Sequence, residues 1–100
     1  MKVRFSAGAK NDLLEIALWI AQDNPSRAES FVEELARACE RLAEMPLAFA
    51  LLPGHEPSGI RRRPYGSYLV FYVAGEDAVE IVRILHGARD YEAVLFQGSD

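Results

Sequence analysis

Polar and cationic side chains gather around the end of an apolar segment late in the chain. They belong to the run Arg83-Ile84-Leu85-His86-Gly87-Ala88-Arg89-Asp90-Tyr91. The apolar residues from Val79 to Leu85 need burial on at least one face, whereas His86 and Arg89 could not both be buried without partners. We therefore expect the chain to leave the core near Gly87. The candidates for a functional surface in this run are Arg83, His86, Arg89 and Tyr91.

A second group of cations, Arg61-Arg62-Arg63, precedes another strand-like run. Strand alternation places Arg61 and Arg63 on one face and Arg62 on the other, so we add Arg61 and Arg63 to the candidate surface. For Arg83 and His86, the sequence is compatible with a structural role as well as with a functional one. Arg83 either reaches an edge of its strand or pairs with a carboxylate, and His86 either transfers protons or hydrogen-bonds the backbone where the strand ends.

Composition indicates a small globular protein. One hundred residues suffice for one domain, and we expect residues 1–100 to form a single one. Hydrophobic residues make up 50% of the chain and charged residues 26%, a balance typical of globular chains. The formal net charge of −4 argues against a protein that coats nucleic acid, because neutralising phosphates requires a basic face.

The sequence contains no pattern for a metal ion, a cofactor or a membrane span. One cysteine and two separated histidines do not make a zinc site, and a glycine-rich phosphate loop is absent. The single cysteine, Cys39, cannot form an intramolecular disulfide, which fits a reducing compartment. With no signal peptide and no run of about 18 apolar residues, we expect a cytoplasmic protein without cofactors, metal ions or membrane contact.

Two helices are expected in the first half of the chain. Ser6 can cap a helix from Ala7 to about Asp23, with Asp12 left for solvent. The predicted apolar face of this helix comprises Leu13, Leu14, Ala17, Leu18, Ile20 and Ala21. Asn24-Pro25 marks the start of a second helix, because asparagine caps free backbone N–H groups and proline suits the first helical position.

The rest of the chain predicts a mainly antiparallel sheet. The segment Pro46 to Ser58 holds three prolines and no sustained period, so we expect a loop there. The expected strands are Lys2 to Phe5, Ile60 to Arg63, Ser67 to Val73 and Val79 to His86, with a closing helix from Tyr91 to Phe96. A short turn at Ala74-Gly75-Glu76-Asp77 makes the last two strands antiparallel.

Both faces of this sheet are rich in apolar side chains. In the strand before the turn, alternation places Tyr68, Val70 and Tyr72 opposite Leu69, Phe71 and Val73. In the last strand it places Ile81, Arg83 and Leu85 on one face. Two helices cover only one face of a sheet, so the other stays open unless a partner or the closing helix covers it. We therefore expect a substantial exposed apolar groove.

These features together resemble the ParE/RelE superfamily of bacterial toxins, the toxic components of type II toxin–antitoxin systems, often labelled plasmid stabilisation proteins. The resemblance covers nearly the whole chain. It rests on Asn24-Pro25, Met45-Pro46, Ile60-Arg61-Arg62, Tyr65-Gly66-Ser67-Tyr68, and the strand Ile81 to His86 followed by Gly87-Ala88-Arg89-Asp90. It implies an α+β fold: an N-terminal strand, an α-helical hairpin packed on a small, mainly antiparallel sheet, and a short C-terminal helix.

The superfamily resembled here has two main activities on one scaffold. RelE-like members cleave messenger RNA on the ribosome, whereas ParE-like members inhibit DNA gyrase without cleaving RNA. The His-Gly-x-Arg-Asp ending and the Tyr-Gly-x-Tyr strand entrance resemble the ParE branch. That resemblance implies a growth inhibitor that is not itself an enzyme. It binds DNA gyrase, is neutralised by a cognate ParD-like antitoxin, and reaches operator DNA only through that antitoxin.

Two alternatives stay open. A ribosome-dependent messenger RNA endonuclease would use His86 with Arg61 and Arg83, because cleavage needs an activated 2′-hydroxyl, a cation beside the phosphate and a proton donor. RelE-like toxins often supply these groups from a lysine-rich sheet, whereas this chain has only Lys2 and Lys10. The other alternative is a degenerate toxin that only binds its antitoxin. An antitoxin would lay an amphipathic helix and an extended segment across the open apolar surface.

Overall fold

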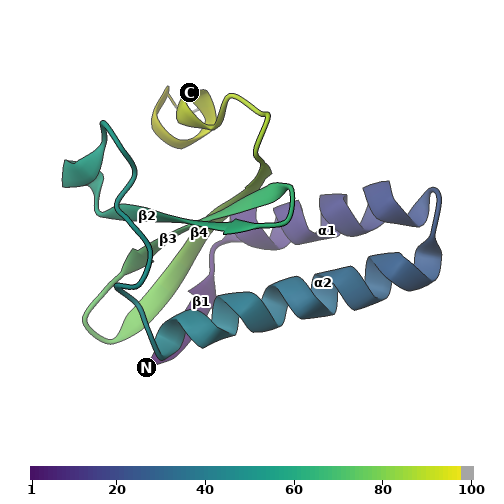
Figure 1. The fold of residues 1–100 in the computed structure, drawn as a ribbon, viewed down its shortest axis with the longest axis horizontal. Helices are drawn as coiled ribbons and strands as arrows, with labels where there is room; N and C mark the ends of the chain where they lie inside the picture. Colours follow the sequence, from purple (N-terminus) through teal and green to yellow (C-terminus); the bar gives the residue numbers. More distant parts are fainter. Residues whose placement is uncertain (98–100) are drawn as a thin grey trace.

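The fold is an antiparallel helix pair packed on a four-stranded sheet, as seen in a computed structural model that describes residues 1–97 (Figure 1). The elements are β1 (Lys2–Phe5), α1 (Ala7–Ala21), α2 (Pro25–Glu40), β2 (Ile60–Tyr65), β3 (Tyr68–Ala74), β4 (Ala78–His86) and a π-helical turn (Ala93–Gln97). The strand order is β1-β4-β3-β2, with β1 parallel to β4 and the other pairs antiparallel. The predicted α+β fold is confirmed.

Side-chain caps start both helices where the sequence predicts them. The Ser6 hydroxyl accepts a hydrogen bond from the Ala9 N–H at 3.0 Å and donates one to the Val82 carbonyl of β4 at 2.7 Å. The Asn24 side chain accepts from the Arg27 N–H at 3.1 Å, and a proline occupies the first turn of α2. The first cap therefore also fixes the start of α1 against the last strand.

The buried face of α1 differs from the predicted one. Ala9, Asp12 and Ile16 are buried, whereas Leu14 is 56% exposed and Leu18 is 60% exposed. The helix is apolar around most of its circumference, so its sequence offers more than one face to the core. The prediction that Asp12 lies in solvent was wrong, because this carboxylate finds a cationic partner inside the molecule.

The core has two parts, one on each face of the sheet. Val70 and Tyr72 pack under the helices, and Phe71 packs on the opposite side, as alternation along β3 predicts. In β4 the register shifts, so that Phe71 pairs with Arg83 but Tyr72 pairs with Ile81. Leu85 therefore lies on the Phe71 side and Ile81 on the helix side, which corrects the prediction that Ile81, Arg83 and Leu85 share one face.

The chain itself covers much of the second face. Tyr91, Val94 and Leu95 pack against the cluster around Phe71, and the ring centroids of Phe71 and Tyr91 are 5.1 Å apart. His55 lies in the loop before β2. Its Nε2 is 2.9 Å from the Glu92 carboxylate, and its ring stacks on that of Phe96 with the centroids 4.0 Å apart. Part of the apolar surface that we expected to be open on this face is thus covered, and three of the exposed large apolar side chains, Leu14, Leu18 and Trp19, lie on α1.

Cys39 belongs to the core beneath the sheet. Burial raises the pKa of its thiol to about 12, so the thiol stays protonated at neutral pH. Because the thiolate is the reactive form, Cys39 acts as a small apolar side chain rather than as a nucleophile.

Candidate functional site

An internal ion pair ties α1 to β4 beside the candidate residues. The Arg83 guanidinium donates to both Asp12 carboxylate oxygens, from Nε at 2.8 Å and from Nη2 at 2.9 Å. The Ile84 backbone N–H donates to the same carboxylate at 2.9 Å, at a position of β4 beyond the residues paired with β1. Asp12 therefore supplies a hydrogen-bond acceptor to the backbone of β4 at a position that β1 is too short to reach.

This pair assigns Arg83 a structural role. The hydrogen bond to Asp12 raises the pKa of Arg83, so the guanidinium remains charged at any working pH. Of the two roles that the sequence left open for Arg83, pairing with a carboxylate is the one found. The sequence did not identify Asp12 as the partner, because Asp12 shares a helix face with Ala9 and Ile16 and the sequence alone does not show that this face is buried.

A cavity of about 140 Å³ lies between α1 and the ends of β3 and β4. Its lining combines apolar, aromatic and polar residues: Asp12, Glu15, Ile16, Trp19, Tyr68, Ile84, Leu85, His86 and Arg89. We call it the Trp19 pocket. It brings His86 and Arg89 of the sequence-predicted set together with Trp19, which is 65% exposed.

The hydrogen bonds of His86 define what its ring can do. Its Nδ1 accepts from the Ala88 backbone N–H at 3.1 Å, and the ring meets Tyr68 edge-on at 5.4 Å. A neutral imidazole whose Nδ1 accepts carries its proton on Nε2. The exposed His86 ring therefore offers a hydrogen-bond donor through Nε2, whereas its Nδ1 lone pair accepts the hydrogen bond from the Ala88 N–H.

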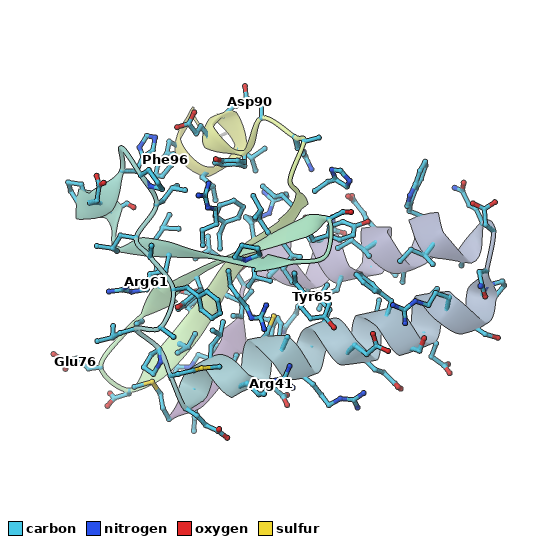
Figure 2. The ribbon with its side chains drawn as sticks, viewed as in Figure 1. Arg41, Arg61, Tyr65, Glu76, Asp90 and Phe96 are labelled. Carbon is cyan, nitrogen blue, oxygen red and sulfur yellow. The ribbon has the colours of Figure 1, made fainter. Side chains whose placement is uncertain are left out.

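Arg61 and Arg63 are held in another part of the molecule, by the loop that precedes β2. The Arg61 guanidinium donates to the Phe49 carbonyl at 2.8 Å. The Arg63 guanidinium lies 5.1 Å from the Phe49 ring centroid and 5.4 Å from that of Tyr65. Figure 2 shows Arg61 well apart from the C-terminal turn that begins near Asp90. Neither arginine lines the Trp19 pocket.

Tyr91 lies on the second face of the sheet. Its ring packs on Phe71, and its hydroxyl accepts a hydrogen bond from Arg62 at 3.0 Å. The six predicted residues thus fall into separate groups. His86 and Arg89 line the pocket, and Arg83 is bonded to Asp12, which also lines it. Arg61 and Arg63 lie on β2, and Tyr91 lies on the opposite face of the sheet.

Metal-binding clusters and membrane-spanning helices were sought among the described residues. Between residues 1 and 97, His, Cys, Asp and Glu side chains form no group of three or more that could hold a metal ion. No helix in this part of the chain is both long and apolar enough to cross a membrane.

Two solved structures share this fold. A chain of the chromosomal ParDE toxin–antitoxin system from P. aeruginosa matches with a TM-score of 0.73 and 19% identity, covering 86% of this chain and 95% of that one. A chain of the RelBE2 toxin–antitoxin complex from Mycobacterium tuberculosis matches with a TM-score of 0.64 and 22% identity, covering 85% and 95%. At these identities the likeness concerns the fold alone.

Sequence comparison goes further than the fold. Toxin ParE1 of Mycobacterium tuberculosis, in strains H37Rv and CDC 1551, is 34% identical over 70 residues, which cover 69% of this chain and 70% of the relative. The family model described as the ParE toxin of the type II toxin–antitoxin system parDE matches residues 3–91. The chain therefore belongs to the ParE family of type II toxin–antitoxin toxins.

Proposed function

We propose that this toxin inhibits DNA gyrase by binding it, and that a cognate ParD-like antitoxin neutralises it. The observation that carries the proposal is the rim of the Trp19 pocket, where His86 and Arg89 offer hydrogen-bond donors beside an exposed tryptophan. Exposed aromatic and arginine side chains around a pocket are the composition of a protein-binding hot spot. We propose His86, Arg89 and Trp19 as the target-binding surface.

The arrangement of the cations favours binding over RNA cleavage. A ribonuclease would need His86, Arg61 and Arg83 around one phosphate. Arg83 is neutralised by Asp12, and Arg61 is bonded to the loop at Phe49. The lone pair of His86 is engaged by a backbone N–H. Messenger RNA cleavage is therefore the alternative to gyrase inhibition, and experiments on growing cells can distinguish the two.

The direct test is pulse labelling of bacteria within minutes of inducing this chain without an antitoxin. Inhibition of gyrase predicts that DNA synthesis falls first, because replication depends on supercoil removal while translation continues. An early fall in protein synthesis would overturn the proposal in favour of messenger RNA cleavage. If neither falls, the chain is a degenerate toxin, and gyrase supercoiling assays with the purified protein should then also show no inhibition.

Replacing His86 with alanine separates binding from catalysis. We expect growth inhibition to weaken by roughly two- to tenfold, because one hydrogen bond at an interface contributes about 0.5 to 1.5 kcal/mol. A general acid or base contributes about 10²- to 10⁴-fold in rate, so a loss of that size would identify His86 as catalytic. The measurement is the inducer concentration that halves the growth rate, with protein level checked by immunoblot.

A further inference from the structure

The apolar surface of α1 runs into the Trp19 pocket. Leu14, Leu18 and Trp19 are each more than half exposed. Leu14 and Leu18 lie one helical turn apart, and Trp19 follows Leu18 on the side of the helix that lines the pocket. Trp19 also lines the pocket, together with the buried side chains of Ile16 and Ile84. A helix that is apolar on its outer side as well as its inner side is normally covered on both.

The rim of the pocket has one unneutralised strong cation. The Arg89 side chain is exposed, and its guanidinium makes no hydrogen bond or ion pair within residues 1–97. Glu15, the exposed carboxylate in the lining, accepts a hydrogen bond from Asn11 at 3.1 Å. The Arg89 guanidinium, the Nε2–H of His86 and the Trp19 indole N–H are all donors, so they favour an acceptor, and Arg89 favours one with negative charge.

The volume of the pocket limits what enters it. An apolar cavity of about 150 Å³ is large enough to hold benzene, and the Trp19 pocket measures about 140 Å³. One phenyl ring or one branched aliphatic side chain therefore fits, provided that its backbone stays outside.

We propose that the Trp19 pocket binds a bulky apolar side chain of a partner protein that carries a carboxylate next to it, the carboxylate being bound by Arg89. The partner segment would continue as an amphipathic helix over Leu14 and Leu18. The inference rests on the proposed function, under which this segment belongs to the antitoxin. Its binding covers His86 and Arg89, which explains neutralisation as occlusion of the target-binding surface.

Charge favours a peptide over a nucleic acid in this pocket. The chain carries a formal net charge of −4, and Glu15 and Asp12 share the lining with the single free arginine. Nucleic-acid binding draws most of its affinity from several neutralised phosphates. A carboxylate needs only one well-placed guanidinium.

Trp19 is the only tryptophan of the chain, so its fluorescence reports binding at the pocket. The probe is N-acetyl-Phe-Glu-amide, titrated into the purified full-length protein. The matched probes are N-acetyl-Phe-Gln-amide, which lacks the charge, N-acetyl-Ala-Glu-amide, which lacks the ring, and the dinucleotide pTpT. We expect the Phe-Glu probe to bind with a Kd of about 1 mM and the other three to bind about three- to tenfold more weakly.

Two variants with the same change in net charge make the test specific. Arg89→Gln is expected to abolish the preference for Phe-Glu over Phe-Gln, whereas Arg41→Gln, on the outer surface after α2 (Figure 2), should retain it. Equal binding of Phe-Glu and Phe-Gln, tighter binding of pTpT, equal effects of both variants, or no binding at about 10 mM would each overturn the inference. None of these results bears on the pulse-labelling outcome, so the two proposals fail separately.

Discussion

Replacing Asp12 with alanine is expected to destabilise this toxin by about 3 kcal/mol, the low end of the range for breaking a buried ion pair. Asp12 is 3% exposed, and its loss leaves the Arg83 guanidinium and the Ile84 N–H without their acceptor. Arg83 keeps 28% of its side-chain exposure, so water offsets part of the loss. Urea unfolding followed by far-ultraviolet circular dichroism measures the change.

Two further variants serve as controls for the Asp12→Ala measurement. Glu15→Ala removes an exposed carboxylate from the same helix and should change the free energy of unfolding by no more than about 0.5 kcal/mol. The double variant Asp12→Leu with Arg83→Met should recover part of the loss, because an apolar pair leaves no uncompensated charge. A cost below about 1 kcal/mol for Asp12→Ala would mean that solvent replaces this carboxylate readily.

Replacing Arg89 with glutamate is expected to reduce growth inhibition by about 30-fold or more, since a hot-spot residue contributes at least about 2 kcal/mol. The Arg89 side chain is exposed and makes no hydrogen bond or ion pair with the rest of residues 1–97, so the melting temperature should stay within about 2 °C of the original. The readout is the inducer concentration for half-maximal growth inhibition, measured beside the melting temperature of the purified protein.

Charge reversal elsewhere provides the control for Arg89. Arg41→Glu alters the net charge equally on another surface and should leave growth inhibition within about twofold. If Arg89→Glu were fully toxic, the Trp19 pocket would not be the target-binding surface. If both variants lost activity equally, overall charge rather than a site would explain the loss.

The sequence predicted the features that depend on neighbouring residues. The bounds of β1, the caps Ser6 and Asn24 and the alternation along β3 were all correct. Each of these follows from a rule that acts over a few positions, such as a hydroxyl three residues before a free N–H.

The predictions were wrong where the structure depends on contacts between residues far apart in the sequence. Asp12 is buried because Arg83 lies opposite it, 71 positions away along the chain. The shifted register at Ile81 and Arg83 depends on the pairing of β4 with β3. Neither fact is encoded locally, and helix periodicity alone could not choose between the Leu14 and Ile16 sides of α1.

The candidate site was predicted in part. The run from Arg83 to Tyr91 contains His86 and Arg89, which do line the Trp19 pocket. Trp19 was missed as their neighbour because its position depends on how α1 is rotated against the sheet. Proximity in sequence also grouped Tyr91 with them, although the turn after β4 carries Tyr91 to the other face.

Because β1 pairs with β4, Lys2–Phe5 cannot complete their strand pairing until Ala78–Ile81 have been synthesised. The Ser6 hydroxyl meets Val82 across 76 positions. At roughly 5 to 20 residues per second, this separation corresponds to about 4 to 15 seconds of synthesis. During that time the nascent chain holds neither the Trp19 pocket nor its Asp12 support. The Trp19 pocket therefore forms only after β4 has been synthesised, so a partner that recognises it meets a finished domain rather than a nascent one.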